Sequence, residues 1–128
     1  GAKSTDVLVK AQAIRITNAK DLANQVFSIA REDCAVTAGV SLRFDASGNA
    51  TVADGSGTTN FTAAAVSNAL VGNAPLVSGA EDGFNGFASL YAYSYSKPDG
   101  RTVYAVVEHD GTALTNLSKG YLLLWSQQ

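Results

Sequence analysis

The sequence has little of what catalytic and metal sites usually need. Its 128 residues include one cysteine, Cys34, and one histidine, His109. A single cysteine excludes an internal disulfide and leaves the redox compartment open. A cysteine nucleophile needs a base within hydrogen-bond reach, and nothing in the sequence brings Cys34 to His109. No serine stands in a G-x-S-x-G context. We therefore expect no catalytic residues, no metal and no cofactor, and we keep a small Cys/His-dependent enzyme only as the last alternative.

Charge is also scarce, and it is spread thinly. Charged residues make up 16% of the chain, against about 25% in a typical globular protein. The nine Lys and Arg residues form no basic run, which excludes the clustered cationic surface that nucleic acid or polybasic membrane attachment needs. The longest apolar run is YLLLW at 121–125, far shorter than the ~20 residues of a membrane span. We expect neither a nucleic-acid partner nor a membrane span.

Methionine is absent, so we expect Gly1 to be a processed or cleaved end. In place of charge the chain has many Ala, Gly, Ser, Thr and Asn residues. Small polar surfaces of this kind are common on secreted proteins and on subunits that pack against copies of themselves. The composition therefore favours an extracellular or virion protein over a cytoplasmic one. The length is that of a single domain, residues 1–128, which can bury a core without disulfides.

Three loops combine oxygen ligands or small residues with glycine, as ion-binding loops do. Counted from Asp45 in DASGN, the calcium-binding EF-hand pattern needs a glutamate at position twelve, where Ser56 stands. The segment EDGFNG (81–86) has a similar composition without a complete pattern. The segment GSGTTN (55–60) lacks the lysine of a phosphate-binding P-loop. We predict a β-turn at DASGN and an ordinary loop at 55–60.

Hydrophobic spacing predicts two helices and a strand in the first 72 residues. Residues 17–33 have an N-cap at Asn18, and Leu22, Val26, Ile29 and Ala30 follow at helical spacing. The second half of 6–17 is predicted as a strand, with a helix continuing into the next segment as the competitor. Residues 61–72 are predicted as an alanine-rich helix, capped by Asn60 or Thr59 and stopped by Gly72.

Period-two patterns predict hairpins. Val40, Leu42 and Phe44 share one face, Gly48 in the following turn can take positive φ, and ATVAD (50–54) is the return strand. A long surface connection at 73–86 precedes two strands, 87–96 and 101–109, which KPDG joins. The segment 113–128 is either a final helix or a strand from Tyr121. The fold expected is α+β: a mainly antiparallel sheet of about five strands with two or three helices packed on one face.

Four of the five tyrosines lie in 87–111, at Tyr91, Tyr93, Tyr95 and Tyr104. Because side chains alternate along a strand, the first three share one face. A three-residue turn with a glycine bulge would place them opposite Val103, Ala105 and Val107, giving a mixed apolar face that could be core. A four-residue loop would instead place them opposite Thr102, Tyr104 and Val106, gathering all four tyrosines.

Buried tyrosine needs a partner for its hydroxyl, and tyrosine is enriched at interfaces. We therefore predict that Tyr91, Tyr93, Tyr95 and Tyr104 form an interface, with a core role as the alternative. YAYSYS (91–96) also has no charge, and uncharged strand edges invite pairing. The function expected is a self-associating, non-enzymatic structural subunit of a virion or an extracellular filament, whose partner is another copy of itself or another protein.

The segment from Gly39 to Gly57, a hairpin with D-x-x-G at its tip followed by a helix, resembles a Roadblock-type dimerisation domain. The segment VVEHDGTALTNL (106–117) would be the last strand and helix of such a domain. An additional segment before the first helix departs from that pattern. The resemblance implies a second function, an intracellular adaptor domain that dimerises and binds a protein partner.

Overall fold

The computed structural model describes residues 12–30, 36–55, 57–77, 87–111 and 121–127. Within these ranges the chain forms nine strands, one α-helix and one short 3-10 helix. In chain order the elements are β1 (Ile14–Ile16), η1 (Ala19–Leu22), β2 (Val26–Ala30), β3 (Val36–Phe44), β4 (Ala50–Asp54), β5 (Gly57–Phe61), α1 (Ala63–Leu70), β6 (Leu76–Val77), β7 (Phe87–Ser96), β8 (Thr102–Gly111) and β9 (Tyr121–Gln127).

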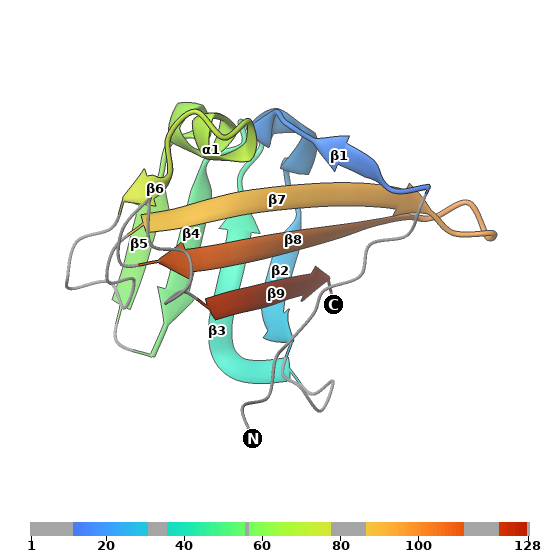
Figure 1. Cartoon of the computed structure of the whole chain (residues 1–128). Coiled ribbons are helices and arrows are strands. Elements are labelled where there is room, and N and C mark those ends of the chain that lie inside the picture. The colour runs from blue at the N-terminus through green and yellow to red at the C-terminus, as the bar shows by residue number, and fades with distance from the viewer. Residues whose placement is uncertain (1–11, 31–35, 56, 78–86, 112–120, 128) are drawn as a thin grey trace, which may run out of the picture.

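All nine strands belong to one antiparallel sheet with the order β1-β7-β8-β9-β2-β3-β4-β5, and β6 pairs with β7. The sheet curls into a half-barrel, so that β7 and β8 cross in front of β3 and β4 at a steep angle (Figure 1). The helices α1 and η1 lie together along one side of the curl and pack against each other. The two ends of the sheet are β1 and β5, which do not pair with each other.

The core fills the inside of this curl. Phe27 of β2 and Phe44 of β3 meet edge to face, with ring centroids 5.9 Å apart, the geometry that aromatic quadrupoles favour. Leu22 of η1 and Leu70 of α1 are fully buried from the helical side. The strands β1 to β4 and β6 to β8 contribute buried side chains to the same interior, so a single hydrophobic cluster connects the sheet with both helices.

The expected fold class was wrong in its proportions. The sheet is antiparallel as expected, but the described residues contain nine strands and one α-helix instead of about five strands and two or three helices. The number of strands was underestimated because segments with helical or loop-like composition are extended in the structure. With that many strands the sheet covers its own interior by curling, and the helices cover only one side of it.

The largest single error was the helix expected over residues 17–33. Asn18 does act as a cap, because its side chain accepts a hydrogen bond from the Lys20 N–H at 3.0 Å. The helix stops after one 3-10 turn, and Asn24 takes a positive φ of 64°. The chain then extends as β2, where Phe27 pairs with Leu42. Pairing with two neighbouring strands, β3 and β9, outweighed the helical spacing of the apolar residues.

The expected loop at 55–60 was also wrong, because its last four residues, 57–60, belong to β5. The helix after it is confirmed at Ala63–Leu70, but its N-cap is Thr62, whose hydroxyl accepts from the Ala65 N–H at 3.1 Å. Gly72 follows the helix with φ +79°, as the stop signal predicted. The expected connection at 73–86 contains β6, and 78–86 lies outside the described residues.

The remaining strand predictions are confirmed. The second half of 6–17 contains β1, and the hairpins 39–54 and 87–109 correspond to β3–β4 and β7–β8. Residues from Tyr121 onward form a strand, β9, which lies between β8 and β2. The final helix of the Roadblock-type pattern would fall at 112–117, outside the described residues.

Candidate functional site

The turn between β7 and β8 fixes which side chains the tyrosines face. The Lys97 N–H donates to the Arg101 carbonyl at 2.7 Å, and the Gly100 N–H donates to the Lys97 carbonyl at 2.9 Å. Gly100 has φ +88°, so Pro98, Asp99 and Gly100 form a three-residue loop with a glycine bulge. Tyr91, Tyr93 and Tyr95 therefore pair with Val107, Ala105 and Val103 respectively. This is the first of the two registers that the sequence left open.

The same register sorts the hairpin into two faces. On the inner face, Ala88, Leu90, Ala92 and Val106 are at most 4% exposed and belong to the core. The side chains of Tyr91, Tyr93 and Tyr95 point the other way, because residues on one strand alternate. Tyr91 is 39% exposed, and the other two are half-buried. We call the side of β7 that carries these three residues the tyrosine face.

Tyr104 does not share that surface. It pairs with Ser94 and lies on the inner side of β8, where it is half-buried against the core. Its backbone N–H donates to the side-chain oxygen of Gln127 at 2.9 Å, and the Gln127 amide nitrogen in turn donates to the side chain of Gln25. The four tyrosines grouped in the sequence are thus separated by the register into three outward residues and one inward residue.

One cation lies beside the tyrosine face. Arg15 of β1 pairs with Tyr93, and its guanidinium carbon is 5.6 Å from the centroid of the Tyr91 ring. The same guanidinium donates to the Leu70 carbonyl at 3.0 Å, at the last turn of α1. There the negative end of the helix dipole favours a positive charge. Arg15 therefore connects the tyrosine face to the helix. No local pattern of residues predicted this contact, because it depends on the long-range pairing of β1 with β7.

Lys97 and Arg101 stand at the turn end of the β7–β8 hairpin, in register with the tyrosines. Between this turn and His109, the described side chains on the outer side of β7 and β8 are uncharged. Those flanking the tyrosines are Ser89, Val103, Ala105 and Val107, and His109 stands towards the far end of β8. Val107, whose register neighbours are Tyr91 and Leu124, is only 8% exposed. The surface between the turn and His109 is thus aromatic and apolar.

The idea that YAYSYS is a free strand edge was wrong. β7 pairs with β8 along its whole length and with β1 and β6 on its other side. An uncharged edge does exist, but it belongs to β5, the last strand of the sheet. Sequence reasoning missed that edge because it assigned 55–60 to a loop.

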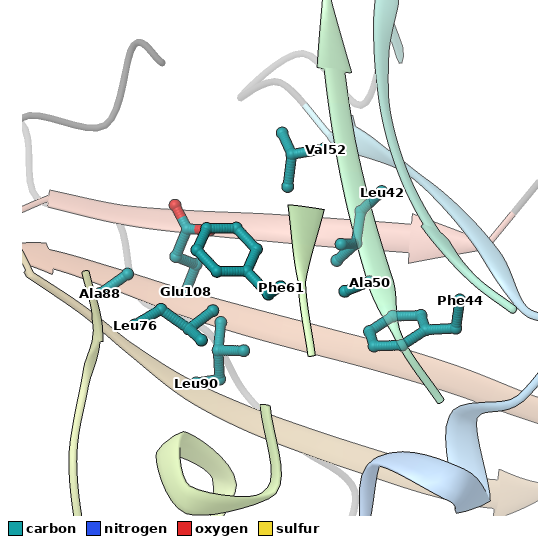
Figure 2. Close-up of a pocket in the computed structure, with 9 residues that line it drawn as sticks. All are labelled: Leu42, Phe44, Ala50, Val52, Phe61, Leu76, Ala88, Leu90 and Glu108. Carbon is teal, nitrogen blue, oxygen red and sulfur yellow. The ribbon is translucent and has the colours of Figure 1, made fainter. Parts of the chain in front are cut away.

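A hollow lies inside the curl, against the described core. It is lined by side chains of β3 to β8, with the Glu108 carboxylate at one side (Figure 2). Its free volume of about 370 Å³ includes solvent, and the side chains leave room for about one water molecule. Glu108 itself is 3% exposed. A space of that size is a packing defect of the core, and we assign it no ligand.

The DASGN segment is a turn whose carboxylate is occupied by amide donors. Asp45 accepts from the Ser47 and Asn49 backbone N–H groups at 2.8 and 2.9 Å, and from the Asn49 side-chain amide at 2.9 Å. These bonds, with that of the Asn49 side chain largest, hold the pKa of Asp45 below its usual value of 3.8. The Asn49 side-chain oxygen also accepts from the Ala63 N–H at 2.8 Å, which connects this turn to the start of α1. The predicted β-turn is confirmed.

The other candidate residues are only partly placed. His109 lies half-buried on β8, opposite Ser89. Cys34 and the EDGFNG segment lie outside the described residues, so a meeting of Cys34 with His109 stays untested. In the part of the chain that the structure describes, no three His, Cys, Asp or Glu side chains gather closely enough to hold a metal ion. No described helix is both long and apolar enough to cross a membrane.

Comparisons of this chain with protein-family models, with curated proteins and with solved structures found no match in any of the three.

Proposed function

We propose that this protein is a non-enzymatic structural subunit that associates with copies of itself through the tyrosine face, as a component of a virion or an extracellular filament. The observation that carries the proposal is the direction of Tyr91, Tyr93 and Tyr95, which stand on the side of β7 turned away from the core. The core is already filled from the opposite side of the same strand by Ala88 and Leu90.

The chemistry of this face suits contact with protein. Tyrosine rings supply large apolar area, while their hydroxyls remain hydrated or hydrogen-bonded at the edge of a contact. Interface cores are depleted in charge and enriched in aromatic residues, with arginine also favoured. The tyrosine face has this composition, and Arg15 is already held in place by the Leu70 carbonyl. Association would therefore desolvate few charged groups.

The test is the double substitution Tyr91→Ser with Tyr93→Ser, followed by molar mass from light scattering and by circular dichroism. The account expects the assembly to be lost while the spectrum and the unfolding transition remain those of a folded domain. The control is Val71→Ser, which removes an apolar side chain that is 46% exposed and lies at the C-terminal cap of α1, not on β7. That control should assemble as the unsubstituted protein does.

Two results would contradict the proposal. Unchanged assembly of the double variant would show that the tyrosine face is not the contact. An unfolded double variant would show that the tyrosines are needed for the fold itself. A stable dimer that grows no further would instead favour the adaptor function, with another protein as its partner.

A further inference from the structure

The strand β5 ends the sheet, and β4 is its one neighbouring strand within the described part of the chain. Its central residues include Thr58 and Asn60, which are exposed, and Thr59, which is half-buried. An edge strand presents backbone N–H and C=O groups that can pair with another strand. The register of β5 with β4 decides which of its backbone N–H and C=O groups point to the outer edge.

Hydrogen bonding at the β3–β4 turn shows which residue pairs of the β3–β4 ladder are hydrogen-bonded. The Asp45 N–H donates to the Asn49 carbonyl at 2.9 Å, so this pair is a hydrogen-bonded one. Hydrogen-bonded and non-hydrogen-bonded pairs alternate in an antiparallel ladder. In β4, Thr51 and Ala53 therefore bond towards β3, and Ala50, Val52 and Asp54 bond towards β5.

The same alternation continues into β5. Val52 pairs with Thr59, so the backbone of Thr59 is used by β4. The N–H and C=O groups of Thr58 and Asn60 consequently point to the open edge. The two-residue connection between Asp54 and Gly57 agrees, because the closing pair of such a hairpin is a hydrogen-bonded one.

Nothing in the sequence of β5 discourages pairing. Natural edge strands are usually protected by lysine, by proline, by a bulge or by inward-pointing charge. GTTNF has no charged residue and no proline, and its register with β4 is continuous over five pairs. This edge is therefore open to an added strand.

We propose that β5 pairs antiparallel with β5 of a second copy of this chain, around a twofold axis at Thr59. Thr58 of each copy then lies opposite Asn60 of the other. Since these are the two residues whose backbone groups point outward, the register makes four backbone hydrogen bonds. A twofold axis at Thr58 or at Asn60 would bring fewer outward groups together. The contact deepens the proposed function, on which it rests, by adding a second surface to the tyrosine face.

The side chains support this self-pairing. Asn60 already forms a cross-strand pair with Thr51, whose hydroxyl donates to the Asn60 side-chain oxygen at 2.8 Å. The proposed register would place Thr58 of the second copy on the other side of Asn60, extending this row of polar side chains across the contact. At the axis the two Thr59 side chains would face each other, a pair that sheets favour. A charged or bulky side chain at these positions would oppose the contact, and the strand has none.

A disulfide tests the register directly. In a Cys34→Ser background, Thr59→Cys would place two cysteines in a non-hydrogen-bonded pair, with Cα atoms about 4.5 Å apart, within the range of about 4.4–6.8 Å that a disulfide spans. The matched control, Thr58→Cys in the same background, would separate the cysteines diagonally by about 7–8 Å. Mild oxidation should yield a covalent dimer with the first variant and little with the second. Equal yields, or none from Thr59→Cys, would overturn the proposal.

A second pair of variants tests the backbone groups. Thr58→Pro removes the outward N–H, which is one donor from each copy, while Thr58→Val keeps it. Proline is tolerated on an edge strand when its missing N–H faces solvent. Provided that circular dichroism shows both folded, Thr58→Pro should weaken association roughly tenfold or more, since two hydrogen bonds are lost. Thr58→Val should associate as before, and equal association of both variants would contradict the register.

The two contacts are separable. In a Tyr91→Ser, Tyr93→Ser background, Thr59→Cys should still give the covalent dimer if the β5 contact is real. Loss of the cross-link there would show that β5 pairing depends on the tyrosine face. A cross-link without any higher assembly in the unsubstituted protein would sustain the β5 contact and contradict the proposed function.

Discussion

The two faces of β7 differ in both composition and burial. The buried part of the inner face consists of Ala88, Leu90 and Ala92, which are small or aliphatic. The outer face consists of Tyr91, Tyr93 and Tyr95, which are large, hydroxylated and only partly covered. One strand thus has an inward side that suits a curled sheet and an outward side that suits contact with another molecule.

The difference follows from geometry. Small side chains on the inner face of β7 let this strand pack closely against α1. Tyrosines placed there would need partners for three hydroxyls inside a crowded interior. On the outer face the hydroxyls can reach water, so the rings add little unfavourable free energy. They also provide apolar area that another molecule could bury. This division of roles can be broken experimentally.

The largest effect is expected from Leu90→Ala on the inner face. Leu90 is 4% exposed and borders the hollow in the core, so its removal enlarges a space that already exists (Figure 2). We expect a loss of about 2–5 kcal/mol in unfolding free energy. Tyr91→Ala on the outer face should cost about 1 kcal/mol or less. Urea unfolding of the two variants measures both, and equal losses would abolish the distinction between the faces.

The two glycine turns extend the comparison from strands to loops. Gly48 and Gly100 have nearly the same φ, +89° and +88°. A Cβ at Gly48 would lie 2.7 Å from the Ala19 carbonyl carbon of η1, whereas a Cβ at Gly100 would meet nothing within 4 Å. Gly100→Ala should therefore cost only the conformational strain, about 1–2 kcal/mol. Gly48→Ala should have the same strain and, in addition, a steric clash with the backbone of η1, so it should lower the free energy of unfolding by about 2–4 kcal/mol. Thermal unfolding would reveal the order, and the reverse order would contradict the docking of this turn on η1.

A smaller effect is expected where the tyrosine face meets the helix. Arg15→Ala removes the hydrogen bond to the Leu70 carbonyl and the contact with the Tyr91 ring. Together these two contacts contribute about 1 kcal/mol to the free energy of unfolding. Arg43→Ala, at an exposed position on β3, is the matched loss of an arginine and should be close to neutral. If both variants lose the same stability, the contacts of Arg15 contribute nothing.

The smallest effect is expected on stability at low pH, through the Asp45 carboxylate. The pKa of Asp45 is lowered in the folded state, so its ionised form adds stability above the unfolded pKa of about 3.9. That contribution is lost as pH falls through the lower folded pKa. Asn49→Ala removes the largest cause, so the pKa of Asp45 should rise towards 3.8. The pKa of Asp99 is lowered first by the Arg101 backbone N–H, and it should not move. Carboxyl NMR titration of both aspartates gives the answer.

The sequence predicted the hairpins because their signals are local. Gly48 and Gly100 sit where the turns need positive φ, and period-two alternation identified the strands on either side. The helix at Ala63–Leu70 was found for the same reason, since its alanines and its stop at Gly72 lie within one segment. Features that depend on residues close together in the chain could therefore be predicted from the sequence.

Features that depend on distant partners were not. In residues 26–30 the apolar spacing fits a helix and a strand equally, and the choice was made by pairing with β3 and β9, about 10 and 100 positions away. The separation of Tyr104 from the other three tyrosines required the register, which differs by one residue between two plausible turns. The open edge at β5 and the position of Arg15 follow from the order of strands in the sheet, which no local pattern encodes.

The most direct test of the central claim is the molar mass of the unsubstituted protein in solution, measured by light scattering across a concentration series and followed by imaging of the largest species. The account predicts a large defined ring, shell or fibre whose formation depends on the tyrosine face. A monomer of 13.2 kDa at every concentration would contradict it.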